Sequence, residues 1–194
     1  GANVVDWPIS YDELEPYYLK VEELVGISGK YEKHPYEPPR STANFTQPPT
    51  QENAVVKLLD KSCENLNIKS LVTPRSVLSQ DKGHRKACYY SNFCGSYGCS
   101  SGAKGSSREA LLMPALATGN LTLMSNTYVK SLHTSIKEAV DYAVVVNTLT
   151  GKEEHIYADL FVVAAQAHES ARLLLNSANT LHPNGLANSS GELG

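Results

Sequence analysis

The first periodic segment of the chain predicts a helix near its N-terminus. Apolar residues at positions 14, 18, 21 and 25 recur at helical spacing and would form one apolar face. Ser10 and Glu13 have the spacing of a capping box, in which each side chain satisfies a backbone N–H group at the helix start. Because proline fits the first turn of a helix, we expect a short turn and then a helix from Pro16 to Val25, ended by Gly26.

Residues 31–66 predict an extended connection followed by a second helix. Five of the ten prolines lie in residues 31–50, and proline lacks the N–H group that strand pairing needs. Residues 51–66 return to helical spacing, which places Cys63 toward the core as a small hydrophobic residue. A short strand, residues 69–73, is expected next.

Residues 83–107 are rich in Gly, Ser, Cys and Tyr and follow neither a helical nor a strand period. We therefore expect a loop with a specific task. Ser106 and Glu109 again have capping-box spacing. The helix that they begin should reach roughly Leu112, where Pro114 disturbs it.

From residue 120 onward the pattern becomes that of strands. The strand-like segments are residues 121–124, 127–132, 140–146 and 155–157, and residues 150–152 form a turn before the last of them. Residues 160–165 are uniformly apolar, which is typical of a strand buried on both faces. They lead directly into an expected helix, residues 169–177, and this order is typical of dinucleotide-binding domains.

The composition is that of a folded protein with a core, since 41% of the 194 residues are hydrophobic and 19% are charged. A net charge of −3, without clustered Lys and Arg, gives no sign of a nucleic-acid partner. The apolar run at residues 160–165 is far too short to cross a bilayer. The chain begins at Gly1 and contains no Gly-rich phosphate loop, so we expect an internal piece of a larger protein.

Three groups of segments, taken in order along the chain, carry a family resemblance. The first is residues 7–18 (WPISYDELEPYY) with 22–29 (EELVGISG). The second is residues 87–104 (ACYYSNFCGSYGCSSGAK), continuing to 112–115 (LMPA) and 119–121 (GNL). The third is residues 161–165 (FVVAA) with 170–177 (SARLLLNS) and 182–191 (HPNGLANSSG). Together they resemble the glucose-methanol-choline (GMC) family of flavoproteins, particularly its gluconate-dehydrogenase-like branch.

Several expectations come with this resemblance. Family members of this kind carry FAD and oxidise an alcohol carbon by hydride transfer to the flavin. The resemblance implies an α/β (α+β) fold, an incomplete FAD/NAD(P)-binding-type domain with a β-meander plus a helical and loop excursion. The family's G-x-G-x-x-G fingerprint lies before the matched region and its catalytic histidine after it, so no catalytic residue is expected before Gly194.

The resemblance also divides the chain into three parts and names its partners. Residues 1–82 would be an excursion bordering the substrate and flavin side, 83–119 the cysteine-rich loop and helix, and 120–194 part of the FAD-binding domain. The partners implied are a small-molecule alcohol or sugar and an electron acceptor, such as a cytochrome or a small subunit.

Four residues are candidates for contact with the cofactor. In the family, a strand valine close to the position of Val129 offers its backbone N–H and C=O groups to the adenine edge, although an ordinary core strand fits the pattern equally well. Ala164 and Ala165 lie where strand turns into helix, and small residues there permit close backbone approach to a cofactor. Gln166 stands where the family usually has Gly, and its side chain could instead bond the flavin or ribose.

The spacing Cys88-x5-Cys94-x4-Cys99 leaves several interpretations open. Some dehydrogenases of the family hold an iron–sulfur cluster in a similar loop, and three thiolates can serve a three-iron cluster. The second gap is one residue longer here than in those enzymes. A disulfide or simple free thiols fit the spacing equally well. Zinc is disfavoured because no Cys-x2-Cys pair is present.

The leading hypothesis is an FAD-dependent oxidoreductase that acts on the CH–OH group of a sugar, sugar acid or alcohol. The present segment alone should be inactive because it lacks the phosphate loop and the catalytic base. Two alternatives are a non-catalytic β-rich interaction module and an iron–sulfur electron carrier.

Overall fold

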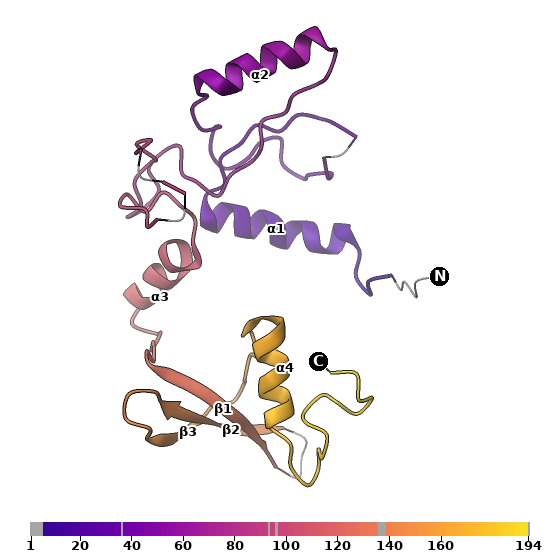
Figure 1. Cartoon of the computed structure of the whole chain (residues 1–194), viewed down its shortest axis with the longest axis vertical. Helices are drawn as coiled ribbons and strands as arrows, with labels where there is room; N and C mark the ends of the chain where they lie inside the picture. Colours follow the sequence, from indigo (N-terminus) through magenta and orange to yellow (C-terminus); the bar gives the residue numbers. More distant parts are fainter. Residues whose placement is uncertain (1–5, 36, 93, 96, 136–138, 194) are drawn as a thin grey trace. The chain divides into compact units, whose positions relative to one another are not determined.

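The computed structural model describes residues 6–35, 37–92, 94–95, 97–135 and 139–193. The chain forms two compact units, Gly1–Thr122 and Leu123–Gly194. Helices and irregular segments make up the first unit, and a three-stranded antiparallel sheet with one helix makes up the second (Figure 1). This mixture confirms the predicted α/β (α+β) class. Within the described ranges no helix has the length and apolar character that crossing a membrane requires.

Helix α1, Tyr11–Val25, is fixed at both ends by local sequence. The predicted capping box is confirmed: the Ser10 hydroxyl accepts a hydrogen bond from the Glu13 N–H, and the Glu13 carboxylate accepts one from the Ser10 N–H at 2.7 Å. Gly26 ends the helix in the left-handed conformation, with φ +81°. A Cβ costs energy in that conformation, so glycine is favoured there.

Pro16 lies inside α1, so the predicted helix start at Pro16 is wrong. The proline ring lacks the N–H that would donate to the carbonyl of Asp12. This loss concerns one hydrogen bond on an exposed part of the helix, and the helical turns on either side persist.

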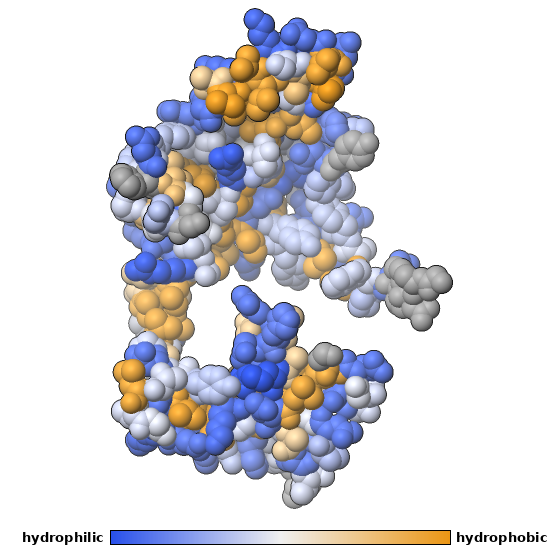
Figure 2. All heavy atoms as spheres, in the orientation of Figure 1, coloured by the Kyte–Doolittle hydropathy of each residue, from blue (hydrophilic) through white to orange (hydrophobic). Residues whose placement is uncertain are grey.

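Helix α2, Ala54–Asn65, begins where the Asn53 side chain accepts a hydrogen bond from the Val56 N–H at 3.0 Å. It contains no buried residue, and Cys63 is only half-buried. The prediction that Cys63 faces a core is therefore wrong. The apolar residues of α2 are instead on the surface, where Figure 2 shows a group of hydrophobic side chains.

The strand predicted at residues 69–73 is absent from the described structure, where this segment is extended without pairing. Isolated bridges organise the region instead. Ser28, which is buried, pairs in parallel with Gln47 and antiparallel with Arg75, and Val77 pairs with Lys104. The segments that pair here are loops far apart in the sequence, and hydrophobic periodicity does not predict such pairing.

The helix after the cysteine loop passes its proline without ending. It consists of a π-helical turn, η1 (Arg108–Leu112), followed by α3 (Met113–Ala117). Pro114 cannot donate to the carbonyl of Ala110, and the wider turn, in which the Met113 N–H bonds the Arg108 carbonyl, accommodates the ring. The predicted end near Leu112 is thus wrong, while the predicted disturbance by Pro114 is present as the π-helical turn.

The second unit contains the predicted meander. Strands β1 (Thr127–Thr134), β2 (Val140–Asn147) and β3 (Glu153–Tyr157) pair antiparallel in sequence order. Gly151 turns the chain between β2 and β3 with φ +71°, as the turn signal predicted. The register of β1 on β2 shifts between Val129 and Ser131, which is the signature of a bulge.

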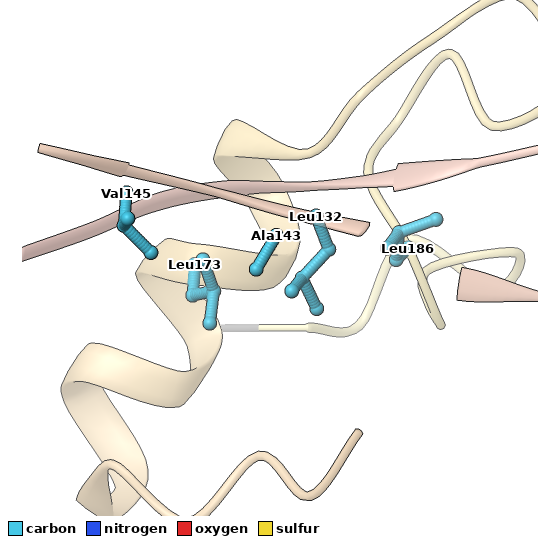
Figure 3. Close-up of a cluster of buried hydrophobic side chains, with 5 residues drawn as sticks. All are labelled: Leu132, Ala143, Val145, Leu173 and Leu186. Atoms are coloured by element: carbon cyan, nitrogen blue, oxygen red, sulfur yellow. The ribbon is translucent and has the colours of Figure 1, made fainter. Parts of the chain in front are cut away.

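Helix α4, Gln166–Asn176, packs against β1 and closes a small apolar core. Figure 3 shows this core, which consists of Leu132, Ala143, Val145, Leu173 and Leu186. The Ser177 hydroxyl ties the end of the helix to the sheet, because it accepts from the Leu132 N–H at 2.8 Å and donates to the Leu173 carbonyl at 2.6 Å. Helix α4 starts three residues before the predicted residue 169.

Two predicted strands of the second half are wrong. Residues 121–124 and 160–165 belong to no helix or strand, and the described residues provide no strand that pairs with them. Leu160 and Val162 expose 78% and 79% of their surface, although the apolar run predicted burial on both faces. Phe161 alone of these packs against the core of Figure 3.

Candidate functional site

A groove in the second unit lies along β1, the segment 161–165 and the first turns of α4. Its volume is about 480 Å³. Apolar side chains predominate in its lining, among them Leu132, Phe161 and Leu173, and Arg172 supplies the positive charge. A mainly apolar lining with a few polar groups is typical of a small-molecule site.

The groove brings together three of the four cofactor-contact candidates. Val129, Ala164 and Ala165 all line it, although Val129 is separated from the two alanines by more than thirty residues. Val129 lies in β1, one of the two edge strands of the described sheet, so backbone groups on its outer side have no strand partner within the described residues. Their role in cofactor binding stays a prediction.

Gln166 does not line the groove, and its backbone explains the glycine that the resemblance leads one to expect there. Its φ is +66°, in the left-handed region. Glycine adopts this conformation without a steric cost, whereas a residue with a Cβ is strained there. The tight turn from the segment 161–165 into α4 is therefore retained although the residue type has changed.

Two side chains of α4 bind backbone groups of residues that line the groove. The Ser170 hydroxyl accepts from the Ala165 N–H at 3.2 Å. Arg172 Nε donates to Glu169 Oε2 at 2.7 Å, and Nη2 donates to the Val129 carbonyl at 3.3 Å. The sequence analysis overlooked Arg172; the signal was its position three residues after Glu169, a spacing at which helical side chains meet.

The cysteine loop of the first unit forms a separate cavity of about 430 Å³. Cys88, Cys94 and Cys99 all line it, together with Lys104 and Arg75. All four cysteines of the chain, each within the described residues, are free thiols. The described residues contain no group of three or more His, Cys, Asp or Glu side chains placed to hold a metal ion. The three thiols therefore share a cavity without forming a ready metal site.

Cys99 has the most distinctive surroundings of the three thiols. Burial raises the pKa of this thiol, but the Ser101 hydroxyl and three backbone N–H groups in residues 101–104 lower it more, so the net pKa lies below its ordinary value. Sulfur and hydroxyl oxygen are 3.4 Å apart. Donors around a sulfur atom favour its thiolate form.

Two cations fix the cysteine loop from within. Lys104 Nζ donates to the carbonyls of Gly95 at 2.7 Å and Tyr97 at 2.9 Å. Arg85 is 3% exposed and donates to three carbonyls, those of Val25, Gly102 and Ala103. Burial lowers the pKa of Arg85, yet a guanidinium stays charged at neutral pH. These contacts give both side chains a structural role that the sequence did not reveal.

Comparison of the chain with known proteins identifies its family. The family model described as GMC oxidoreductase matches residues 4–186. The chain is similar to a paromamine 6'-oxidase of Streptomyces fradiae, at 33% identity over 100% of this chain and 34% of the relative. It is also similar to a 2-methyl-1,2-propanediol dehydrogenase of Mycolicibacterium austroafricanum, at 30% identity over 98% of the chain and 34% of the relative.

A third relative is a fructose dehydrogenase large subunit of Gluconobacter japonicus, at 28% identity over 97% of the chain and 34% of the relative. The chain thus spans about a third of the length of the curated relatives that it matches. The family match covers the groove, the cysteine loop and the first two helices alike. The chain belongs to the GMC oxidoreductase family.

Proposed function

We propose that the complete protein is an FAD-dependent oxidoreductase that oxidises the CH–OH group of a sugar, sugar acid or related alcohol. Membership of the GMC oxidoreductase family supports this proposal. So do the names of the relatives, which include oxidases and dehydrogenases of sugars and alcohols. When bound, FAD would accept a hydride from the alcohol carbon.

The observation that carries the proposal is the groove shared by Val129, Ala164 and Ala165. The apolar lining of this groove suits a flat aromatic ring such as adenine. Val129 would offer its backbone N–H and C=O groups to the adenine edge. The absence of large side chains at Ala164 and Ala165 would let the nucleotide approach the backbone, and Gln166 would bond the flavin or ribose.

An orphaned donor supports the fit between this groove and a nucleotide. Arg172 Nη1 is buried and has no hydrogen-bond partner among the described residues. A buried donor without an acceptor is costly, and an oxygen or nitrogen of a bound nucleotide would remove that cost. We propose the same division of labour along the chain as the sequence suggests, with residues 120–194 on the FAD side, 1–82 on the substrate and flavin side, and 83–119 between them in sequence.

The complete gene product that carries this chain tests the proposal. We expect the purified protein to contain FAD and to show a flavin absorption spectrum that bleaches anaerobically when a substrate is added. The first panel should contain fructose, paromamine and 2-methyl-1,2-propanediol, because relatives act on compounds with these names. Deuterium at the reacting carbon should slow bleaching if hydride transfer is the slow step. Purified protein that neither contains nor takes up FAD would refute the proposal.

The electron acceptor needs its own measurement. The relatives named above comprise one oxidase and two dehydrogenases, one of which is a large subunit. Oxygen uptake in the presence of substrate would identify an oxidase. Turnover only with an artificial acceptor would identify a dehydrogenase whose natural acceptor is a partner protein, such as a cytochrome or a small subunit.

An iron–sulfur cluster on Cys88, Cys94 and Cys99 stays a separate prediction. The three thiols line one cavity, but within the described residues no three such side chains are placed to hold a metal ion. Iron and acid-labile sulfide in the anaerobically purified protein would support ligation by these thiols. Full flavin reduction in iron-free protein would contradict a role for an iron–sulfur cluster.

A further inference from the structure

Arg172 of α4 makes three contacts, two with strand β1 and one with a neighbouring residue of its own helix. Its Nη2 donates to the Val129 carbonyl at 3.3 Å. Its guanidinium carbon lies 4.7 Å from the centre of the Tyr128 ring, in cation–π geometry. Its Nε donates to Glu169 Oε2 at 2.7 Å, and that carboxylate fixes the guanidinium plane from the helix side.

These contacts use only part of what a guanidinium can donate. Arginine carries five N–H donors in a rigid fork. Nη1 is buried and, among the described residues, has no acceptor. The Glu169 bond neutralises the charge without satisfying this nitrogen, so the groove contains a buried donor for which no described residue provides an acceptor.

The carbonyl that accepts from Arg172 is that of Val129, a candidate for contact with adenine. A backbone carbonyl has two lone pairs and can accept two hydrogen bonds at once. The Val129 carbonyl therefore keeps one acceptor site when Nη2 occupies the other. The register of β1 on β2 shifts directly after Val129, and the Arg172 bond restrains the carbonyl at this irregular point of the strand.

We propose that Arg172 is a nucleotide-binding residue of this groove, which orients the Val129 carbonyl through Nη2 and donates through Nη1 to an acceptor atom of the ADP half of the cofactor. This inference rests on the proposed function. The Tyr128 ring keeps the guanidinium in place beneath the site, and Glu169 prevents it from turning toward solvent. The planar guanidinium can donate to the Val129 carbonyl and to the nucleotide at the same time, whereas the single ammonium group of lysine cannot.

The test compares three variants of the complete gene product. R172M removes all donors while keeping an unbranched side chain, and R172K keeps the charge but loses the fork. K130M is the matched control: Lys130 is on the same strand, next to Val129, and its exposed ion pair with Glu153 lies outside the groove. The dissociation constants of FAD, ADP and adenosine are measured for the flavin-free proteins, with the melting temperature of each.

We expect R172M to weaken FAD and ADP by about ten-fold or more, which corresponds to the loss of about 1.4 kcal/mol of binding. R172K should fall between R172M and the wild type, and K130M should stay within about two-fold of the wild type, as exposed ion pairs contribute little. Weaker binding of ADP with unchanged adenosine binding would assign Nη1 to a phosphate oxygen. Equal weakening of both would assign it to the ribose or the base.

Three results would overturn the inference. The first is R172M binding ADP as tightly as K130M does. The second is a lower melting temperature in R172M and R172K with unchanged affinity of the folded protein, since this would make Arg172 structural only. In the third, wild-type protein binds neither FAD nor ADP, and the proposed function fails together with the inference. FAD binding in the wild type with no effect of R172M would leave the proposed function standing and remove Arg172 alone.

Discussion

The two units of the chain differ in the interactions found inside each of them. The second unit, Leu123–Gly194, has a meander and a helix that close over an apolar core of five buried residues. Among its described residues the first unit, Gly1–Thr122, has four buried apolar side chains, and it contains a buried polar centre in which Arg85 makes three hydrogen bonds. Its loops meet through isolated bridges rather than through a sheet.

The difference teaches where local sequence is informative. An apolar core needs alternating or helical spacing along short segments, and that spacing is visible in one dimension. A buried arginine that donates to the carbonyls of residues 25, 102 and 103 produces no periodic pattern in the sequence. The following substitutions test this contrast, and unfolding of the complete gene product by urea or heat measures each.

The largest expected loss comes from Arg85→Met in the first unit. It leaves three carbonyls without their donor, and buried unsatisfied groups cost about 1–3 kcal/mol each, so we expect a loss of about 4 kcal/mol. Lys86→Met is the control, because Lys86 forms an exposed pair with Asp81. Equal effects of the two substitutions would show that the polar hub does not hold this unit together.

Leu173→Ala examines the apolar counterpart in the second unit. Leu173 is 6% exposed in the core of Figure 3, and its truncation should cost about 3 kcal/mol through lost burial and the cavity left behind. Leu175→Ala on the same helix is the control, since Leu175 is 40% exposed. The core would be less important than we describe if both substitutions had the same small effect.

Gly105→Ala tests close packing in the first unit. A Cβ at Gly105 would lie 2.3 Å from Val25 Cγ1 and still closer to the Ser76 hydroxyl, so we expect overpacking to cost about 2 kcal/mol. Gly98→Ala is the matched control, because nothing lies within 4 Å of its Cβ position. A neutral Gly105→Ala would mean that the loops of this unit shift easily.

The smallest effect has the opposite sign. Gln166→Gly should stabilise the second unit by about 0.5 kcal/mol, because it relieves a left-handed residue at the start of α4. Gln166→Ala keeps the Cβ and should bring no gain. If glycine and alanine behave alike at this position, the strain at Gln166 is negligible.

The predictions that rest on neighbouring residues in the sequence are the ones that the structure confirms. Ser10 with Glu13, Gly26 and the turn at Gly151 act within a few residues, and the structure confirms all three. The errors fall where neighbours in space decide. Residues 160–165 have a strand's composition, but a strand requires a partner, and the described residues offer none. Pro16 and Pro114 break helices on average, yet neighbouring turns compensate for both.

The sequence by itself determined the two caps of α1, the meander and the family resemblance, because each depends on residue types at short fixed spacings. Tertiary structure alone decided that Val129 and Ala165 share a groove, that Arg172 reaches the Val129 carbonyl, and that three cysteines line one cavity. Those arrangements join residues far apart in the chain, and their geometry depends on how whole elements pack.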